Sequence, residues 1–184
     1  MSSITGVVGE AKLFAHTGTG IITDVTEHPH ALSLSLWCIS YADEPYRTLI
    51  RKGSNTSLTV SGHDAFITGR TYDGDEQARW LTPNGSLVEY IPTFVTVRFS
   101  ETDSSAVVNA FLDGQRQTLA GNGFSTGVLN RTSHPFFIGN GLAGERGWDG
   151  VIDEVRISRV IRSAAWIRLV YENQRGNSVL LTLR

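Results

Sequence analysis

The stretch GWDGVIDEVRISRVIRSAAWIRLVYENQRG, residues 147–176, sets a strand pattern directly before a helix pattern. Apolar and polar residues alternate through VIDEVRIS, which is typical of a β-strand. Ser163 is a suitable N-cap for the helix, and Gly176 stands where a left-handed cap residue is expected. The apolar stripe of this helix consists of Ala164, Ile167, Val170 and Tyr171. Because a helix of about three turns is unstable alone, we expect it to plug an open end of a β-sandwich core.

Period-two alternation dominates the rest of the chain and predicts many short strands. The clearest patterns are ALSLSLWCIS (31–40), FVTVRFS (94–100), AVVNAFLDG (106–114), PFFIGN (135–140) and NSVLLTLR (177–184). Asn84-Gly85 and Asp113-Gly114 are typical of two-residue type I′ hairpin turns, in which both central residues need positive φ. The sequence shows no repeat or linker, so we expect one all-β, two-sheet domain spanning residues 1–184.

Composition argues against several classes of partner. The chain of 184 residues carries 16 Lys and Arg against 18 Asp and Glu, so it lacks the basic excess that nucleic acid or an anionic membrane requires. Its first twenty residues show no signal-peptide pattern, and no apolar run is long enough to cross a bilayer. The single cysteine, Cys38, alternates in phase with the leucines of its strand, which predicts a buried and unreactive thiol.

The closing segment WDGVIDEVRISRVIRSAAWIRLVYENQ resembles that of the laminin-G-like, concanavalin-A-like jelly-roll domains. In that family an aromatic-x-Gly-x-Ile-Asp-Glu-Val-Arg-Ile strand precedes a short helix with a Ser-Ala cap. The segments GVVGEAKLF, LSLSLWCIS, TLIRKG and HPFFIGN are similar to earlier strands of the family. The resemblance implies an antiparallel jelly-roll sandwich of about a dozen strands in two curved sheets. Its single short C-terminal helix would seal the rim beside the last pair of strands.

Catalytic patterns are absent from the sequence. Glycoside hydrolases of this fold resemble one another in an E-x-D-x-x-E strand, which places two carboxylates roughly 5 Å apart. Here Glu101-Thr102-Asp103 continues into serines and alanine, and the acidic run of Asp73, Asp75 and Glu76 contains a glycine that indicates a solvated turn. No Ser/His/Asp or Cys/His motif is present either. We therefore expect a non-catalytic protein with no catalytic residues.

The resemblance also implies one candidate metal site. Members of the family often bind a structural Ca²⁺ at the sandwich rim through the Asp of the Ile-Asp-Glu-Val segment, which is Asp153 here. The family usually has Asp after the Phe of the first strand, whereas this chain has Ala15 after Phe14. The alternative is that Asp153 or Glu154 pairs with Arg156 or caps a turn.

Glycan binding requires an exposed aromatic ring beside hydrogen-bonding side chains. The candidate ligand-binding residues are Trp80, Tyr72, Arg79 and Asn84. Further aromatic or imidazole candidates in turn-rich segments are Tyr41, Tyr46, Trp148 and His63. For Trp80 the alternative is packing in the core, and the patterned positions of Trp37 and Trp166 predict core packing for both.

Two functions remain open for such a binding or attachment module. A chain that starts at Met1 without signal or linker favours a structural component of a larger assembly, such as a phage capsid-decoration or tail protein. Its partners would be other protein subunits, reached through the terminal segments MSSITGVVG and NSVLLTLR, and its location the virion. The alternative is a lectin-like module of a secreted protein, with a glycan as partner and an extracellular location. A glycoside hydrolase or lyase is a remote third reading.

Overall fold

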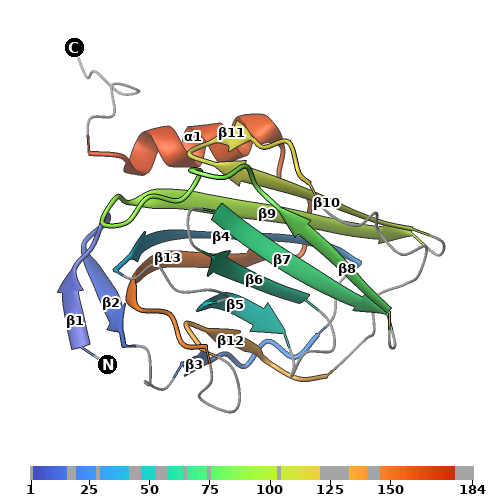
Figure 1. Cartoon of the computed structure of the whole chain (residues 1–184), viewed down its shortest axis with the longest axis horizontal. Helices are drawn as coiled ribbons and strands as arrows, with labels where there is room; N and C mark the ends of the chain where they lie inside the picture. The colour runs from blue at the N-terminus through green and yellow to red at the C-terminus, as the bar shows by residue number, and fades with distance from the viewer. Residues whose placement is uncertain are drawn as a thin grey trace.

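The alternating segments form two antiparallel β-sheets in the computed structural model of the chain (Figure 1). The structure describes residues 2–15, 20–27, 30–41, 47–52, 58–63, 66–73, 76–102, 105–120, 133–140 and 146–176. The seven-stranded sheet has the order β1 (Ser2–Thr5), β2 (Glu10–Phe14), β13 (Gly150–Ser158), β4 (Ala31–Ser40), β9 (Thr93–Thr102), β10 (Ser105–Leu112), β11 (Gln115–Arg116). The six-stranded sheet has the order β3 (Ile21–Ile22), β12 (Phe136–Ile138), β5 (Arg47–Lys52), β6 (Leu58–His63), β7 (Phe66–Asp73), β8 (Glu76–Leu81). This confirms the predicted all-β jelly-roll sandwich.

The main core lies between the two sheets and follows the predicted alternation. In β4 the leucines at 32, 34 and 36 and Cys38 join this core, whereas Trp37 faces the opposite side of the sheet. In β9, Val95, Val97 and Phe99 alternate in the same way with Phe94. Cys38 is 1% exposed, and burial raises the pKa of its thiol, as expected for an unreactive cysteine.

Strand β13 carries the signature sequence and lies between β2 and β4, inside the seven-stranded sheet. This confirms the predicted interior strand over residues 151–157. Ile152 is buried in the main core, and Val155 packs against it. The pairing of β13 with β4 shifts register between Asp153 and Arg156, and Glu154 adopts a φ of 51° at this irregularity. The resulting β-bulge re-aims the Glu154 side chain within the strand.

The helix α1 (Ala164–Gln174) begins after Ser163, whose hydroxyl accepts a hydrogen bond from the Trp166 N–H at 3.1 Å. It lies along the outer surface of the seven-stranded sheet, over β9 and β10 (Figure 1). Its buried residue Ile167 packs with Trp37, Phe94 and Phe111, which form a second cluster on the outer face of that sheet. The expectation that the helix plugs an open end of the core is therefore wrong. Three aromatic residues make the outer face apolar here, and the helix covers them.

The predicted chain reversals have different outcomes. Asp113 and Gly114 both have positive φ, 50° and 75°, and join β10 to β11 as the type I′ prediction requires. The predicted hairpin at Asn84-Gly85 is wrong, because only Gly85 has positive φ and residues 86–92 form no strand. Here Leu87 is drawn into the main core, and the segment continues irregularly to β9. At the helix end the cap residue is Arg175 in an extended conformation, not a left-handed Gly176.

Two further predictions concern the terminal segments and the membrane. The first segment forms β1 from Ser2 to Thr5, and the strand expected within GVVGEAKLF begins only at Glu10. The predicted strand over residues 177–184 lies outside the described residues. Within the described ranges, no helix has the length and apolar character needed to cross a membrane.

Candidate functional site

Two of the predicted aromatic candidates lie in the core. Trp80 is 1% exposed within the main core, which is the alternative left open for it, so neither face of its ring is available to a sugar in this structure. Trp148 is also fully buried, and its indole N–H lies 3.2 Å from both the Ile39 and the Val151 carbonyl oxygens. Alternation along β8 takes Trp80 inward because successive residues of a strand face opposite sides of the sheet.

The other three predicted glycan-binding residues lie on β7, on β8 and in the turn after β8. Arg79 is half-buried on β8 and pairs in register with Arg70 of β7, while Tyr72 pairs with Gln77. Asn84 is exposed in the turn beyond the other end of β8. The side chains of Tyr72 and His63, and the whole of Tyr46, lie outside what the structure describes. Tyr72 and Arg79 thus lie on neighbouring strands, and Asn84 lies in the turn that follows β8.

An exposed aromatic pair lies instead where β4 ends and β9 approaches. The rings of Tyr41 and Tyr90 are stacked, with centroids 5.6 Å apart and an interplanar angle of 21°. Tyr90 is 64% exposed, and its hydroxyl donates to the Tyr41 carbonyl oxygen at 3.2 Å. Tyr41 was among the predicted candidates, whereas Tyr90 was missed. The signal that identifies it is the turn-rich segment PNGSLVEYIP, which contains an aromatic residue between a glycine and a proline.

The backbone holds this pair in place. The Tyr90 N–H donates to the Ser40 carbonyl oxygen at 2.8 Å, and the Tyr41 N–H donates to the Asp149 carbonyl oxygen at 2.9 Å. Tyr90 has a φ of 61°, a conformation that a bulky residue adopts only when its surroundings impose it. Val88 and Ile91, which flank Tyr90 in the sequence, are each 53% exposed. The result is an exposed, fixed aromatic platform, which we call the Tyr41–Tyr90 platform.

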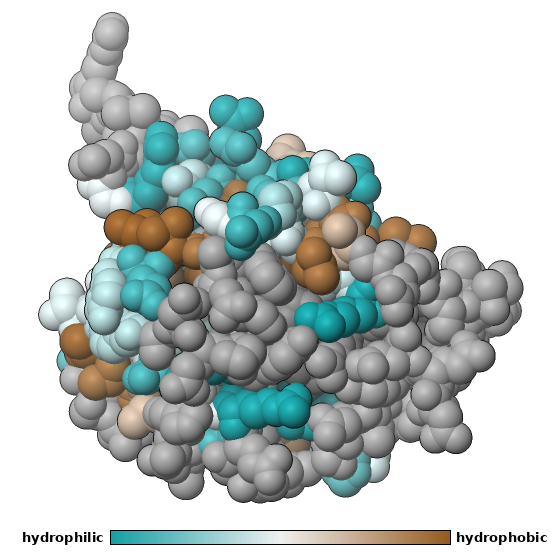
Figure 2. Space-filling view, viewed as in Figure 1, coloured by the Kyte–Doolittle hydropathy of each residue, from teal (hydrophilic) through white to brown (hydrophobic). Residues whose placement is uncertain are grey.

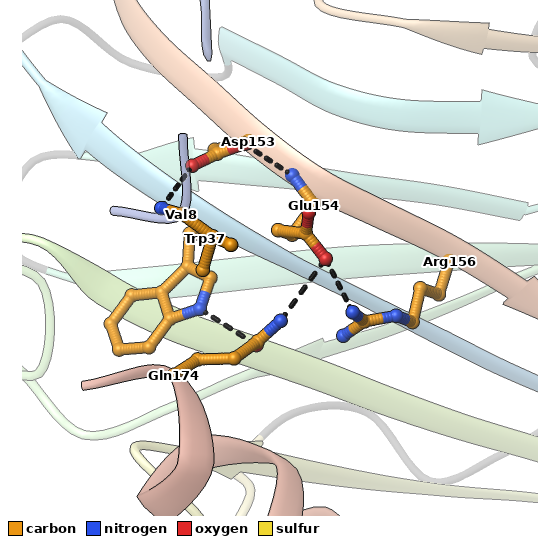
Figure 3. A network of polar contacts seen from close by, with 6 residues as sticks. All are labelled: Val8, Trp37, Asp153, Glu154, Arg156 and Gln174. Carbon is orange, nitrogen blue, oxygen red and sulfur yellow. Dashed lines mark hydrogen bonds and ion pairs between the residues drawn. The ribbon is translucent and has the colours of Figure 1, made fainter. Parts of the chain in front are cut away.

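The signature carboxylate Asp153 acts as a cap in this structure (Figure 3). Its Oδ2 accepts a hydrogen bond from the Val8 N–H at 3.0 Å, and its Oδ1 accepts one from the Glu154 N–H at 2.8 Å. The side chain is 7% exposed. Both carboxylate oxygens therefore face N–H donors, and the described residues contain no group of three His, Cys, Asp or Glu able to hold a metal ion. A Ca²⁺ site requires several converging oxygen ligands, and calcium binding through Asp153 stays a prediction.

The neighbouring signature residues join the sheet to the helix (Figure 3). Glu154 forms an ion pair with Arg156 and also accepts a hydrogen bond from the Gln174 side-chain amide at 3.0 Å. The Oε1 of Gln174 accepts a hydrogen bond from the Trp37 indole N–H at 3.0 Å. Through Asp153, strand β13 holds the turn at Val8, near the start of the chain. Through Glu154, it holds the last turn of α1. Both are structural roles.

The predicted acidic turn is only partly described. β7 ends at Asp73 and β8 begins at Glu76, and these two residues pair in register. This agrees with a chain reversal at Gly74, whereas Asp75 and the side chains of Asp73 and Glu76 lie outside the described part of the structure. The solvated state of these carboxylates remains a prediction.

Comparisons with known proteins identify the fold family. The sequence profile described as "Concanavalin A-like lectin/glucanases superfamily" matches residues 16–168. A search of curated proteins found no match. At 10% identity, the Ruminococcus gnavus sialidase module CBM40 bound to α2,3-sialyllactose has a TM-score of 0.64 over 88% of this chain and 97% of that one.

Two other solved structures are similar. Domain 4 of AbnA, an extracellular arabinanase from Geobacillus stearothermophilus in complex with arabinotriose, has a TM-score of 0.63 and 16% identity, over 92% of this chain and 80% of that one. The binding domain of botulinum neurotoxin DC in complex with SialylT has a TM-score of 0.58 and 13% identity. That match covers 80% of this chain but 36% of the toxin domain. At these identities the similarity shows the fold alone.

Proposed function

This chain belongs to the concanavalin A-like lectin/glucanase superfamily, and from that membership we propose that it is a non-catalytic module that binds carbohydrate outside the cell. The structural neighbours described above are binding domains, two of them solved with sialyllactose or arabinotriose. They support a lectin-like module better than a virion component. Because one fold hosts many functions, the proposal depends on a surface of this chain.

The observation that carries the proposal is the Tyr41–Tyr90 platform. A sugar ring presents an apolar C–H face that packs on an aromatic ring, and its hydroxyls need polar partners nearby. Tyr90 offers a ring that is 64% exposed and already fixed by its stacking on Tyr41 and by its backbone hydrogen bond. A preorganised ring loses little conformational entropy when a ligand binds. Asp149, whose backbone carbonyl accepts the Tyr41 N–H, is half-buried and is the acidic residue bonded to the platform's backbone.

A glycan array that includes arabinotriose and α2,3-sialyllactose identifies the ligand, and titration calorimetry measures its affinity. We expect Tyr90→Ala to weaken binding by about tenfold, equivalent to roughly 1.4 kcal/mol, and Tyr90→Phe to retain most of the affinity. Val107→Ala, at a residue that is 50% exposed on β10, is the matched control. Equal affinity of Tyr90→Ala and the wild type overturns the platform. The absence of binding to any glycan overturns the carbohydrate proposal.

Attachment to a larger assembly, including a phage virion, is the second candidate. The observation that favours it is β1, which lies at the edge of the seven-stranded sheet and, among the strands that the structure describes, pairs only with β2. An edge strand presents backbone N–H and C=O groups that a neighbouring subunit can pair with. A variant that lacks residues 1–5 tests this role. Sedimentation analysis measures its oligomeric state and its incorporation into a particle. Normal folding and assembly of the truncated protein overturns it.

Incubation with β-glucans, alginate and agar tests the non-catalytic part of the proposal. We expect no release of sugar. Turnover that disappears when any pair among Asp73, Asp75, Glu76 and Asp153 is mutated overturns this part.

A further inference from the structure

A groove of about 750 Å³ is lined by residues of helix α1 and of the β10–β11 hairpin. This hairpin lies at the opposite edge of the seven-stranded sheet from β1 (Figure 1). Its volume is within the range of about 300–1,000 Å³ that is typical of small-ligand sites. The side chains that matter for its chemistry are Arg116, Arg168, Tyr171, Glu172 and Arg175. Hydrophilic residues cover this helix in Figure 2, so the groove differs in character from an apolar docking surface.

The hairpin turn packs directly on the helix and forms the floor of the groove. A Cβ added to Gly114 would lie 3.1 Å from the Arg168 Cα and 3.4 Å from the Tyr171 ring, so only glycine allows this close approach. The Asp113 carboxylate is held in the turn, because its Oδ1 accepts the Phe94 N–H at 2.8 Å. The geometry of the groove is therefore set by the fold and needs no ligand to form it.

Two exposed arginines share the groove with the carboxylates of Asp113 and Glu172. Arg116 and Arg168 are both exposed, and neither forms an ion pair with any residue that the structure describes. Near Arg116, Arg98 lies over the Phe111 ring at 4.6 Å and donates to the Arg162 carbonyl oxygen. Burial lowers the pKa of Arg98, and the positive charge of Arg116 lowers it further. The positive charges of Arg98 and Arg116 therefore lie close enough to interact.

The carboxylates of the groove are already engaged. Glu172 forms an ion pair with Arg175, whose guanidinium also lies 5.6 Å from the centre of the Tyr171 ring. The Arg175 Nε is buried and has no hydrogen-bond partner among the described residues. Three arginines against the carboxylates of Asp113 and Glu172 give the groove a formal charge of +1, and the Arg175 Nε–H still lacks an acceptor.

We propose that this groove binds a carboxylated oligosaccharide, with Arg116 and Arg168 holding its carboxylate groups. Guanidinium groups bind carboxylates through two parallel N–H···O bonds, a geometry that a lysine ammonium does not offer. The inference rests on the proposed carbohydrate function for the sugar part of the ligand. It adds a second site, on the opposite side of the seven-stranded sheet from the core and distinct from the Tyr41–Tyr90 platform.

The test is titration calorimetry with an α1,4-linked tetragalacturonate and with the same oligosaccharide after reduction of its carboxyl groups. We expect the acidic form to bind and the reduced form to bind at least tenfold more weakly. Arg116→Gln with Arg168→Gln should lower the affinity for the acidic form by at least tenfold, and added salt should weaken wild-type binding. Arg159→Gln is the matched control, because Arg159 is exposed and pairs with Glu27. Circular dichroism checks the fold of each variant.

The outcomes separate this proposal from the platform. Failure of the wild type to bind tetragalacturonate, or equal binding by the double arginine variant, overturns the groove site. If Tyr90→Ala abolishes acidic binding while the arginine variant retains it, the groove is wrong and the platform stands. If the arginine variant alone loses acidic binding and no glycan depends on Tyr90, the groove stands and the platform is wrong.

Discussion

The indole N–H of Trp37 donates a hydrogen bond to the Oε1 of Gln174 at 3.0 Å, joining the middle of a β-sheet to the last turn of the helix. Gln174 uses its amide N–H₂ at the same time to bind Glu154 of β13. One side chain therefore links two adjacent strands of the seven-stranded sheet, β4 and β13, to α1. The Trp37 ring also lies 5.7 Å from the Tyr171 ring and 5.2 Å from the Phe94 ring. Helix docking thus combines apolar packing with a specific polar contact.

Gln174→Ala should therefore destabilise the protein by about 1–3 kcal/mol, because it leaves the buried Trp37 N–H without an acceptor. Urea denaturation followed by tryptophan fluorescence measures the change. Asn173→Ala is the control, because Asn173 is exposed on the adjacent position of the helix and should change stability by less than about 0.5 kcal/mol. Equal stability of the two variants contradicts the role of the Trp37–Gln174 contact.

Ile167→Ala should destabilise the protein by about 2–4 kcal/mol, because Ile167 is the fully buried helix residue in the outer cluster and a cavity would remain beneath α1. Leu169→Ala, at a residue 50% exposed on the same helix, provides the comparison and should be nearly neutral. The free energy of unfolding from urea titrations distinguishes them. If both substitutions cost the same, the apolar contact between helix and sheet is not what holds α1.

The strands and the start of the helix follow from local patterns, but the place of the helix does not. Period-two alternation identifies β4, β9 and β13, and Ser163 marks the first turn of α1. The same alternation predicts that Trp37 and Phe94 face away from the main core. Two aromatic residues on that side of the sheet indicate an apolar outer face. Which face a helix covers depends on the register between distant strands, and one sequence alone does not state that register.

The candidate site was less predictable for a similar reason. Trp80 shortly precedes the turn at Asn84-Gly85, a position that suggests a surface residue. Its place in the alternation of β8 instead points its side chain into the core. Tyr90 becomes prominent only when the segment after Leu87 approaches the end of β4. The Arg116 and Arg168 pair arises from contact between a hairpin and a helix roughly fifty residues apart in the chain. Long-range contacts of this kind leave no local pattern.

Calcium provides a direct test of the role of Asp153. Because both of its carboxylate oxygens accept backbone N–H groups, we expect the melting temperature to be the same in calcium and in chelator. Asp153→Asn should lower stability by about 1–3 kcal/mol under both conditions, since one oxygen is replaced by a donor that faces another donor. A melting temperature that rises with calcium in the wild type, but not in Asp153→Asn, would instead identify Asp153 as a ligand.

The Asp113 carboxylate predicts a specific pH dependence. Burial raises its pKa above the ordinary value of 3.8, and the hydrogen bond from the Phe94 N–H opposes this shift. Because the pKa is higher in the folded state, the folded protein binds the Asp113 proton more tightly than the unfolded chain does. The stability that this proton contributes is complete below pH 3.8 and is lost as the pH rises through the folded pKa. Asparagine tolerates the positive φ of this turn and keeps an acceptor without the charge.

Asp113→Asn should therefore be more stable than the wild type at about pH 7, and the difference should disappear as the pH falls to about 3. Urea titrations at several pH values measure the difference in the free energy of unfolding between the two proteins. Other groups titrate equally in both proteins and do not affect this difference. A difference that stays constant with pH contradicts the assignment of this dependence to Asp113.

Gly150 of the signature strand is the position where a single methyl group should do most damage. Its φ is 140°, and an added Cβ would lie 2.0 Å from the Ile39 carbonyl oxygen, which is backbone and cannot move without breaking the pairing of β13 with β4. We expect Gly150→Ala to cost at least about 3 kcal/mol, from steric overlap and backbone strain together.

Gly85→Ala is the matched control for Gly150→Ala. Gly85 also has positive φ, 80°, but no atom lies within 4 Å of its added Cβ, so only the backbone strain remains, about 1–2 kcal/mol. Urea denaturation of both variants separates the two causes. If Gly150→Ala lowers the free energy of unfolding no more than Gly85→Ala does, the close approach of β13 to β4 at Ile39 is not the reason for glycine at position 150. The positive φ of that position would then be the sole reason.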